Sequence, residues 1–223
     1  GLRVFSELKQ ILEEENPIPA IRALQDYGLE KILHTQLNID QRTYDLLEEV
    51  YKALSWHDLL YTDEKYPRWS VYFMALISKC SYRVAQELCL YLKIPLKKRK
   101  TVMNGRLKAR EHLVFLEKSI PGTNSGLYKL LSVFNTELIL FMIASAANEN
   151  VKKAISFYYT RLRDVKLLIG GRDLMDLGLT PGPAFSKVFE KILEAKLDGK
   201  VKSKEDEIEY ARRYIKSNKL VDM

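Results

Sequence analysis

Residues Gly170–Asp206 have the sequence GGRDLMDLGLTPGPAFSKVFEKILEAKLDGKVKSKED. This stretch indicates the fold class, because it consists of successive helix start and stop signals. Gly178 and the pair Asp198-Gly199 are typical helix ends, since glycine adopts the left-handed conformation that follows a last helical turn. Thr180-Pro181 and the capping-box residue Ser203 are typical helix starts. No part of the stretch alternates apolar and polar residues for long enough to predict a strand. We therefore expect three consecutive helices here, the middle one over 181–198.

The same signals continue toward the N-terminus. Apolar residues recur at helical spacing in 2–15, Asp40 is a natural cap for a long helix to Leu54, and Ser81 is a natural cap for the next. Pro121–Gly126 is the clearest internal boundary. We predict an all-α fold, an elongated multi-helix array of three subdomains, with a neck-like region over 1–60, a basic body over 61–120, and a distal body and tail over 121–223. The uncapped helix start at residue 2 suggests a longer parent chain.

Composition narrows the class of protein. Of 223 residues, 47% are hydrophobic, which is typical of a globular chain, and Gly and Pro together number only 17, which disfavours turn-rich β folds. The longest uncharged apolar stretch, 138–147, is half of what a membrane span needs, and charged residues interrupt the first ten positions. Two cysteines are too few for a disulfide framework. These observations predict a cytoplasmic protein without a membrane partner.

Positive charge is concentrated in the middle of the chain. Residues 61–118 contain 13 basic and 5 acidic side chains, net +8, whereas residues 1–60 are net −5. A focused basic segment favours a polyanionic partner, nucleic acid first. No acidic residue lies between Lys93 and Arg110, so the basic block in this interval has no local neutralisation, although a merely solvated helix face is the alternative. We predict RNA contacts from all seven of its basic residues: Lys97, Lys98, Arg99, Lys100, Arg106, Lys108 and Arg110.

A second basic cluster follows three aromatic residues, Phe157, Tyr158 and Tyr159. Arginine beside exposed aromatic rings suits RNA, because bases stack on rings while guanidinium groups contact phosphates. Burial of Phe157 and one of the two tyrosines in the core is the favoured interpretation for the aromatics. For the arginines the odds of RNA contact are even, and we include Arg161, Arg163 and Arg172 among the predicted RNA contacts. The cluster comprises Arg161, Arg163, Lys166 and Arg172.

No complete catalytic motif is present. The dipeptide His57-Asp58, with His34 and Asp164, could supply the ligands of an HD-type metal-dependent phosphohydrolase, but such a dipeptide is more often a buried histidine beside a capping aspartate. Phosphate-binding loops, zinc motifs, nucleophile elbows and a DxD pair are all missing from the sequence. We therefore predict no catalytic residue and no metal ligand in this chain.

The stretch that opened this section resembles the C-terminal tail of class II tRNA nucleotidyltransferases (CCA-adding and A-adding enzymes) and bacterial poly(A) polymerases. That family has a run G-x-D-L-x-x-L-G-x-x-P-G-P followed by a helix ending in L-D-G, and the start of this chain is similar to its neck motif R-x-x-x-E-L-x-x-I-L, with Leu2 where a Glu is frequent. The matching positions are Gly171, Asp173, Leu174, Leu177, Gly178, Pro181, Gly182, Pro183, Leu197, Asp198 and Gly199 in the tail, and Arg3, Glu7, Leu8, Ile11 and Leu12 at the start.

The resemblance implies a transferase that adds AMP or CMP to RNA 3′ ends. Its catalytic head, with Mg²⁺ and ATP or CTP, would lie upstream of this chain, so that this chain alone would be inactive and hold no cofactor. Arg3 and Glu7 would brace the neck helices, while body and tail would grip the acceptor and TΨC arm of tRNA, or another RNA. The alternatives are a non-enzymatic helical scaffold that binds RNA or protein, and the HD-type phosphohydrolase.

Gly182 is the last candidate RNA contact. If the helix begins at residue 181, the amides of Gly182 and Ala184 are free in its first turn and can bind a phosphate. A turn used only for packing is the alternative.

Overall fold

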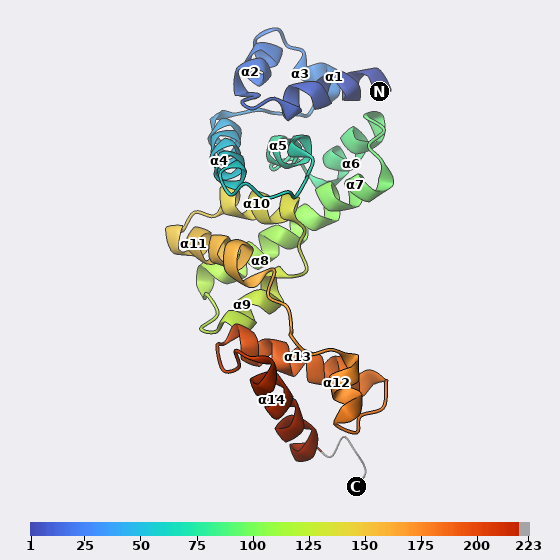
Figure 1. Cartoon of the computed structure of the whole chain (residues 1–223). Coiled ribbons are helices and arrows are strands. Elements are labelled where there is room, and N and C mark those ends of the chain that lie inside the picture. The colour runs from blue at the N-terminus through green and yellow to red at the C-terminus, as the bar shows by residue number, and fades with distance from the viewer. Residues whose placement is uncertain (219–223) are drawn as a thin grey trace. The chain divides into compact units, whose positions relative to one another are not determined.

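A computed structural model describes residues 1–218, and the last five positions of the predicted 121–223 segment lie outside the described residues. All regular secondary structure within 1–218 is helical, which confirms the predicted all-α class (Figure 1). Within this range no single helix is long and apolar enough to cross a membrane. The helices α9 (Asn124–Leu131) and α10 (Thr136–Ser145) reach that length and composition only together, as a bent pair.

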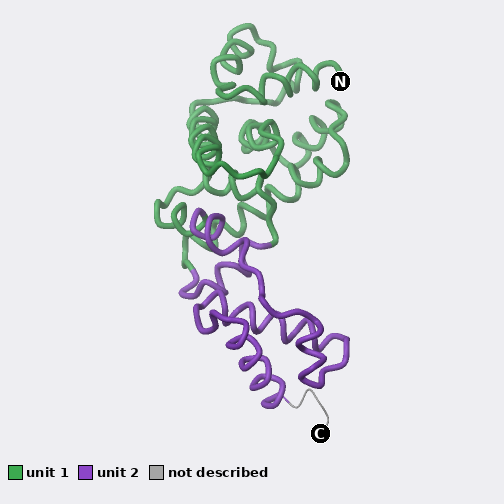
Figure 2. The backbone as a smooth tube through the Cα atoms, viewed as in Figure 1, with its two compact units in different colours: residues 1–120, 133–155 green, residues 121–132, 156–223 purple. Residues whose placement is uncertain are grey.

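The chain forms two compact units (Figure 2). Unit 1 contains residues 1–120 and 133–155, and unit 2 contains residues 121–132 and the chain from 156 onward. Residues 133–155 rejoin unit 1 because α10 packs against α4 (Gln41–Asp58), α5 (Arg68–Leu76) and α8 (Arg106–Lys118). The neck, body and tail expected from the sequence divide the chain in sequence order, whereas the two units group residues by their contacts. The three-part division therefore stays a prediction.

Unit 1 is built around two almost entirely buried helices, α5 (Arg68–Leu76) and α10. Most residues of both are apolar, which is typical of helices covered on all sides. The other helices of the unit surround this core, and most of them bury one apolar stripe, whereas α7 (Leu96–Lys100) buries no residue. These helices are α1 (Leu2–Glu13), α2 (Ile18–Asp26), α3 (Glu30–Leu33), α4 (Gln41–Asp58), α6 (Tyr82–Tyr91), α7, α8 (Arg106–Lys118) and most of α11 (Glu149–Phe157).

Side-chain caps set several helix starts of unit 1 where the sequence placed them. Asp40 accepts a hydrogen bond from the Thr43 amide at 3.0 Å. Ser81 accepts one from the Val84 amide at 3.3 Å. Both satisfy amides that have no partner inside the helix. Asn104-Gly105, a residue pair typical of turns, does not break the helix here, because a π-helical turn over Thr101–Gly105 joins α7 to α8. A Cβ on Gly105 would lie 2.8 Å from Leu138 Cδ1, so a larger residue there would require that side chain to move.

Unit 2 contains α9 (Asn124–Leu131), a π-helical turn over Tyr158–Leu162, α12 (Gly171–Asp176), α13 (Pro183–Leu197) and α14 (Lys204–Ser217). Its core lies among the last three helices and includes Leu174, Val188, Ile192, Ala211 and Ile215. Gly178 (φ 89°) and Gly199 (φ 73°) adopt the left-handed conformation, as the sequence predicted. That conformation is the usual end of a helix. The predicted capping box is also present, since Ser203 and Asp206 each accept the other's backbone amide hydrogen bond.

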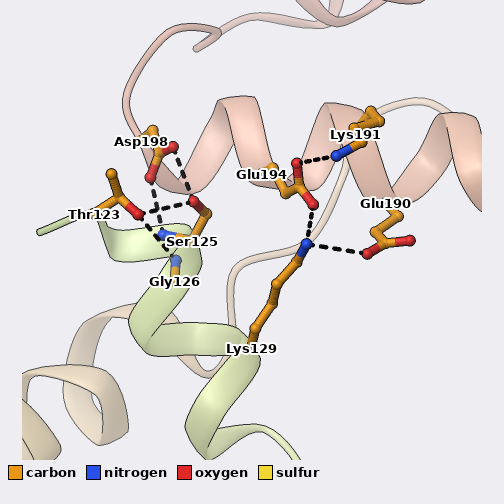
Figure 3. Close-up of polar contacts among 8 residues, drawn as sticks. All are labelled: Thr123, Ser125, Gly126, Lys129, Glu190, Lys191, Glu194 and Asp198. Atoms are coloured by element: carbon orange, nitrogen blue, oxygen red, sulfur yellow. Dashed lines mark hydrogen bonds and ion pairs between the residues drawn. The ribbon is translucent and has the colours of Figure 1, made fainter. Parts of the chain in front are cut away.

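Polar contacts fasten α9 to the C-terminal end of α13 (Figure 3). The Asp198 carboxylate accepts hydrogen bonds from the Ser125 amide and the Ser125 hydroxyl, each 2.9 Å long. One turn further along, Lys129 forms ion pairs with Glu190 (3.3 Å) and Glu194. Asp198 therefore stabilises the N-terminus of α9, where unpaired amides and the helix dipole favour a negative charge.

Candidate nucleic-acid interface

The basic block of unit 1 follows the continuous helix formed by α7, the π-helical turn and α8. Helical spacing places its seven side chains around the axis, so they meet different surroundings. Four are exposed (Lys97, Lys100, Lys108 and Arg110), Lys98 and Arg99 are half-buried, and Arg106 is fully buried.

Besides the buried Arg106, three side chains of the block have intramolecular partners. Lys98 forms an ion pair with the buried carboxylate of Glu137. The Arg110 guanidinium donates a hydrogen bond to the Ser78 carbonyl at 2.9 Å, and the Lys108 ammonium lies 5.9 Å from the centre of the Phe134 ring. These contacts hold α7 and α8 against the rest of unit 1. Lys108 and Arg110 nevertheless remain exposed to solvent.

Arg106 corrects the sequence prediction, because its side chain is 1% exposed and is not part of a surface that could contact RNA. Its Nη1 donates a hydrogen bond to the Ile77 carbonyl at 2.6 Å, at the C-terminal end of α5. The helix dipole favours a positive charge at that end. Burial, and secondarily the neighbouring Arg110, lower the pKa of the guanidinium. Arg106 therefore supports the core of unit 1.

Lys97, Arg99 and Lys100 form no side-chain hydrogen bond or ion pair with any residue in 1–218. Two of them, Arg99 and Lys100, line a groove of about 300 Å³ between α6 and the α7 segment. The other residues that line the groove are Tyr82, Gln86, Leu96, Met103 and Asn104. Free cations beside an open groove are what a phosphate-bearing ligand needs.

The second basic cluster lies in unit 2 and is only partly exposed. Arg161, Lys166 and Arg172 are exposed, whereas the Arg163 guanidinium stacks 4.8 Å from the centre of the Tyr159 ring. Such stacking is a favourable contact between a cation and a ring. Three of the four side chains are therefore exposed to solvent, and the fourth, Arg163, contacts an aromatic ring of the protein.

The aromatic residues beside this cluster lie mostly in the core. Tyr158 and Tyr159 are both buried, whereas the sequence placed only one tyrosine in the core, and burial raises the pKa of Tyr158 to about 12. The expectation for Phe157 was wrong, because this side chain is 43% exposed and not in the core.

Gly182 lies at the residue before α13 and not inside its first turn, because the helix begins at Pro183. Its φ of 168° is extended, and a Cβ there would meet only the Thr180 carbonyl oxygen, at 4.0 Å. The predicted start at residue 181 is thus two residues early. The position remains open to solvent.

Arg3 and Glu7, the neck-motif residues, are exposed on α1 and line an apolar groove of about 290 Å³ between α1, α2 and α3. The HD candidates are engaged elsewhere. His34 contacts Glu87 at 3.0 Å, and His57 is buried against the ring of Tyr66. Within residues 1–218 no group of three or more His, Cys, Asp or Glu side chains is placed to hold a metal ion.

Comparisons of sequence connect the chain to tRNA-processing enzymes. An A-adding tRNA nucleotidyltransferase of Geobacter sulfurreducens is 30% identical over 217 residues, 96% of this chain and 25% of that protein. An A-adding tRNA nucleotidyltransferase of Aquifex aeolicus is 23% identical over 165 residues, 74% of this chain and 19% of that protein. No protein-family profile matches the chain. The chain thus spans a quarter or less of the length of these relatives.

Solved structures show the same fold. The Thermotoga maritima CCA-adding enzyme complexed with tRNA aligns with a TM-score of 0.77 at 22% identity, over 96% of this chain and 52% of that enzyme. A CCA-adding enzyme in complex with CTP aligns with a TM-score of 0.74 at 22% identity, over 96% of this chain and 50% of that enzyme.

The helical fold and the tail motif, together with these relatives, place the chain among the tRNA nucleotidyltransferases. It belongs to the class II family of these enzymes and corresponds to their helical C-terminal region.

Proposed function

We propose that this chain is the tRNA-binding part of an enzyme that adds AMP or CMP to the 3′ end of tRNA. The observation that carries the proposal is the acid-free basic block, in which Lys97, Arg99 and Lys100 have no partner within the described chain. The relatives named as A-adding enzymes and the fold shared with a tRNA-bound CCA-adding enzyme support the choice of tRNA.

The chemistry of addition is assigned to a catalytic head that holds Mg²⁺ and ATP or CTP, joined to this chain in the cytoplasm. The 223 residues contain no DxD pair, so we expect no nucleotide addition by this chain alone. Incubating it with tRNA lacking its 3′ end, ATP, CTP and Mg²⁺ tests this part. Extension of the tRNA by rigorously purified chain would show that the addition chemistry resides here.

Salt dependence tests the binding role. Each phosphate contact contributes about 0.7–0.9 to the slope of log K against log salt, so replacing Lys97, Arg99 and Lys100 together by Gln should lower that slope by roughly 2–3. The matched control replaces three exposed basic residues of the same unit outside the block, Arg42, Lys65 and Lys153, and should change the slope little.

An unchanged slope in the folded triple variant would reduce the block to a solvated helix face. Absence of tRNA binding by the unmodified chain at any salt concentration would instead favour the helical scaffold that was the alternative from the sequence.

A further inference from the structure

The groove between α6 and the α7 segment combines two kinds of chemistry that the basic block alone lacks. Arg99 and Lys100 line one part of it, and no acidic residue is among its lining. Arg99 is half-buried without an ion pair, so its guanidinium has lost part of its hydration without gaining a counter-charge. A phosphate in the groove would supply that charge and accept hydrogen bonds from the planar guanidinium.

The remaining polar lining suits a nucleobase. Tyr82 is 50% exposed, which leaves ring surface available for stacking. The amide side chains of Gln86 and Asn104 offer both donors and acceptors to a base edge. None of these three side chains forms a hydrogen bond or ion pair within residues 1–218. Asn104 lies in the π-helical turn, a distortion that frequently accompanies functional sites.

The groove has a volume of about 300 Å³. This is at the lower end of the range for ligand pockets, so it has room for one small ligand. We propose that this groove binds a single unpaired nucleotide of an RNA strand, with its phosphate at Arg99 and Lys100 and its base against Tyr82. The inference rests on the proposed RNA-binding function and adds a specificity to it: this surface prefers single-stranded RNA to a continuous duplex.

Two RNA probes and two variants of the full 223-residue chain test the proposal. The probes are a single-stranded hexamer of adenylate and a blunt duplex of six base pairs, titrated at one salt concentration, with free AMP as a third arm. Tyr82→Ala removes the stacking surface and should weaken hexamer binding about 5- to 150-fold, the range for loss of one stacked base, while changing duplex binding little. Tyr82→Phe keeps the ring and should bind the hexamer almost as the unmodified chain does.

A matched control separates the nucleotide site from the general RNA-binding function proposed above. Lys97→Gln removes a free cation that does not line the groove, so it should weaken the hexamer and the duplex by the same factor. Because Tyr82 is an exposed surface residue, the melting temperatures of all variants should agree. Gln86→Ala provides a second variant of a residue that lines the groove.

Equal effects of Tyr82→Ala on hexamer and duplex, or no effect on either, would overturn the nucleotide site while leaving RNA binding intact. AMP that binds as tightly as the hexamer would instead identify a site for free mononucleotides and overturn the RNA assignment. Failure of the unmodified chain to bind the hexamer while it still binds tRNA would also overturn the nucleotide site, whereas loss of tRNA binding as well would refute the proposed function itself.

Discussion

Replacement of Arg106 by Ala should destabilise unit 1, although the charge pattern of the sequence places this residue in a basic surface. The change empties the space of a large buried side chain, which costs about 2–5 kcal/mol. It also leaves the Ile77 carbonyl without its charged donor, which costs about 1–3 kcal/mol. Relief from burying a guanidinium whose Nε has no partner offsets part of this loss. We expect a net loss of about 2–4 kcal/mol.

Arg106→Met separates the contributions, because it fills most of the space and removes the buried charge. Its net cost should be below about 2 kcal/mol, and its affinity for tRNA should equal that of the unmodified chain. Lys108→Ala, an exposed change on the same helix, is the stability control. It should alter the unfolding free energy by less than about 1 kcal/mol.

Thermal unfolding followed by circular dichroism measures these effects. At roughly 2–4 °C per kcal/mol for a chain of this size, Arg106→Ala should melt about 5–15 °C below the unmodified chain. The reasoning fails if Arg106→Ala melts normally. It also fails if Arg106→Met melts normally but loses tRNA binding, since the guanidinium would then reach the RNA.

Three further changes have distinct expected outcomes. Asp198→Ala should lower the free energy of unfolding by roughly 1 kcal/mol, the usual effect of losing a helix cap. Ser125 then loses both hydrogen bonds at the start of α9, so amide exchange in α9 should become faster, and unchanged exchange would contradict this. The pKa of Asp40 is lowered from 3.8 to about 2, chiefly by the hydrogen bond from Lys79, so its stabilisation is present above pH 3.8 and disappears as the pH falls toward 2. Asp40→Asn should flatten that part of an acid unfolding curve, and an identical curve would speak against the pair. Gly182→Val should weaken tRNA binding while changing stability by no more than about 1 kcal/mol. The extended backbone and open surroundings tolerate a side chain there, and unchanged tRNA titrations would assign the turn to packing only.

Local signals in the sequence predicted the helix boundaries of this fold well where a side chain or a glycine determines them. Asp40, Ser81 and Ser203 cap helices as expected, and Gly178 and Gly199 end them. The two-unit division was not predictable in the same way. It depends on long-range packing of α10 against helices that precede it by many residues, and no local pattern records that choice.

The burial of Arg106 did have a signal in the sequence. Val102, Arg106, Ala109, Leu113 and Leu116 are spaced by three or four residues, so Arg106 lies in the apolar stripe of its helix. All five are buried. A lysine or arginine within such a stripe is better interpreted as a buried donor seeking a backbone carbonyl than as a surface charge, because helical spacing fixes its direction regardless of the charge of its neighbours in sequence.

The same geometric argument divides most of the basic block between side chains that hold the helix in place and side chains that have no partner in the described chain. The side chains of Lys98, Arg106 and Arg110 meet protein acceptors, a carboxylate in one case and backbone carbonyls in the others, and thereby hold the helix in place. Those of Lys97, Arg99 and Lys100 meet none within the described chain. A net charge of +8 over residues 61–118 therefore overstates the number of cations free to release counterions on RNA. The groove could not be predicted from the sequence for a similar reason. Its aromatic and amide residues belong to α6 and the π-helical turn, and only the packing of these two elements against each other brings Tyr82 and Gln86 close to the free cations.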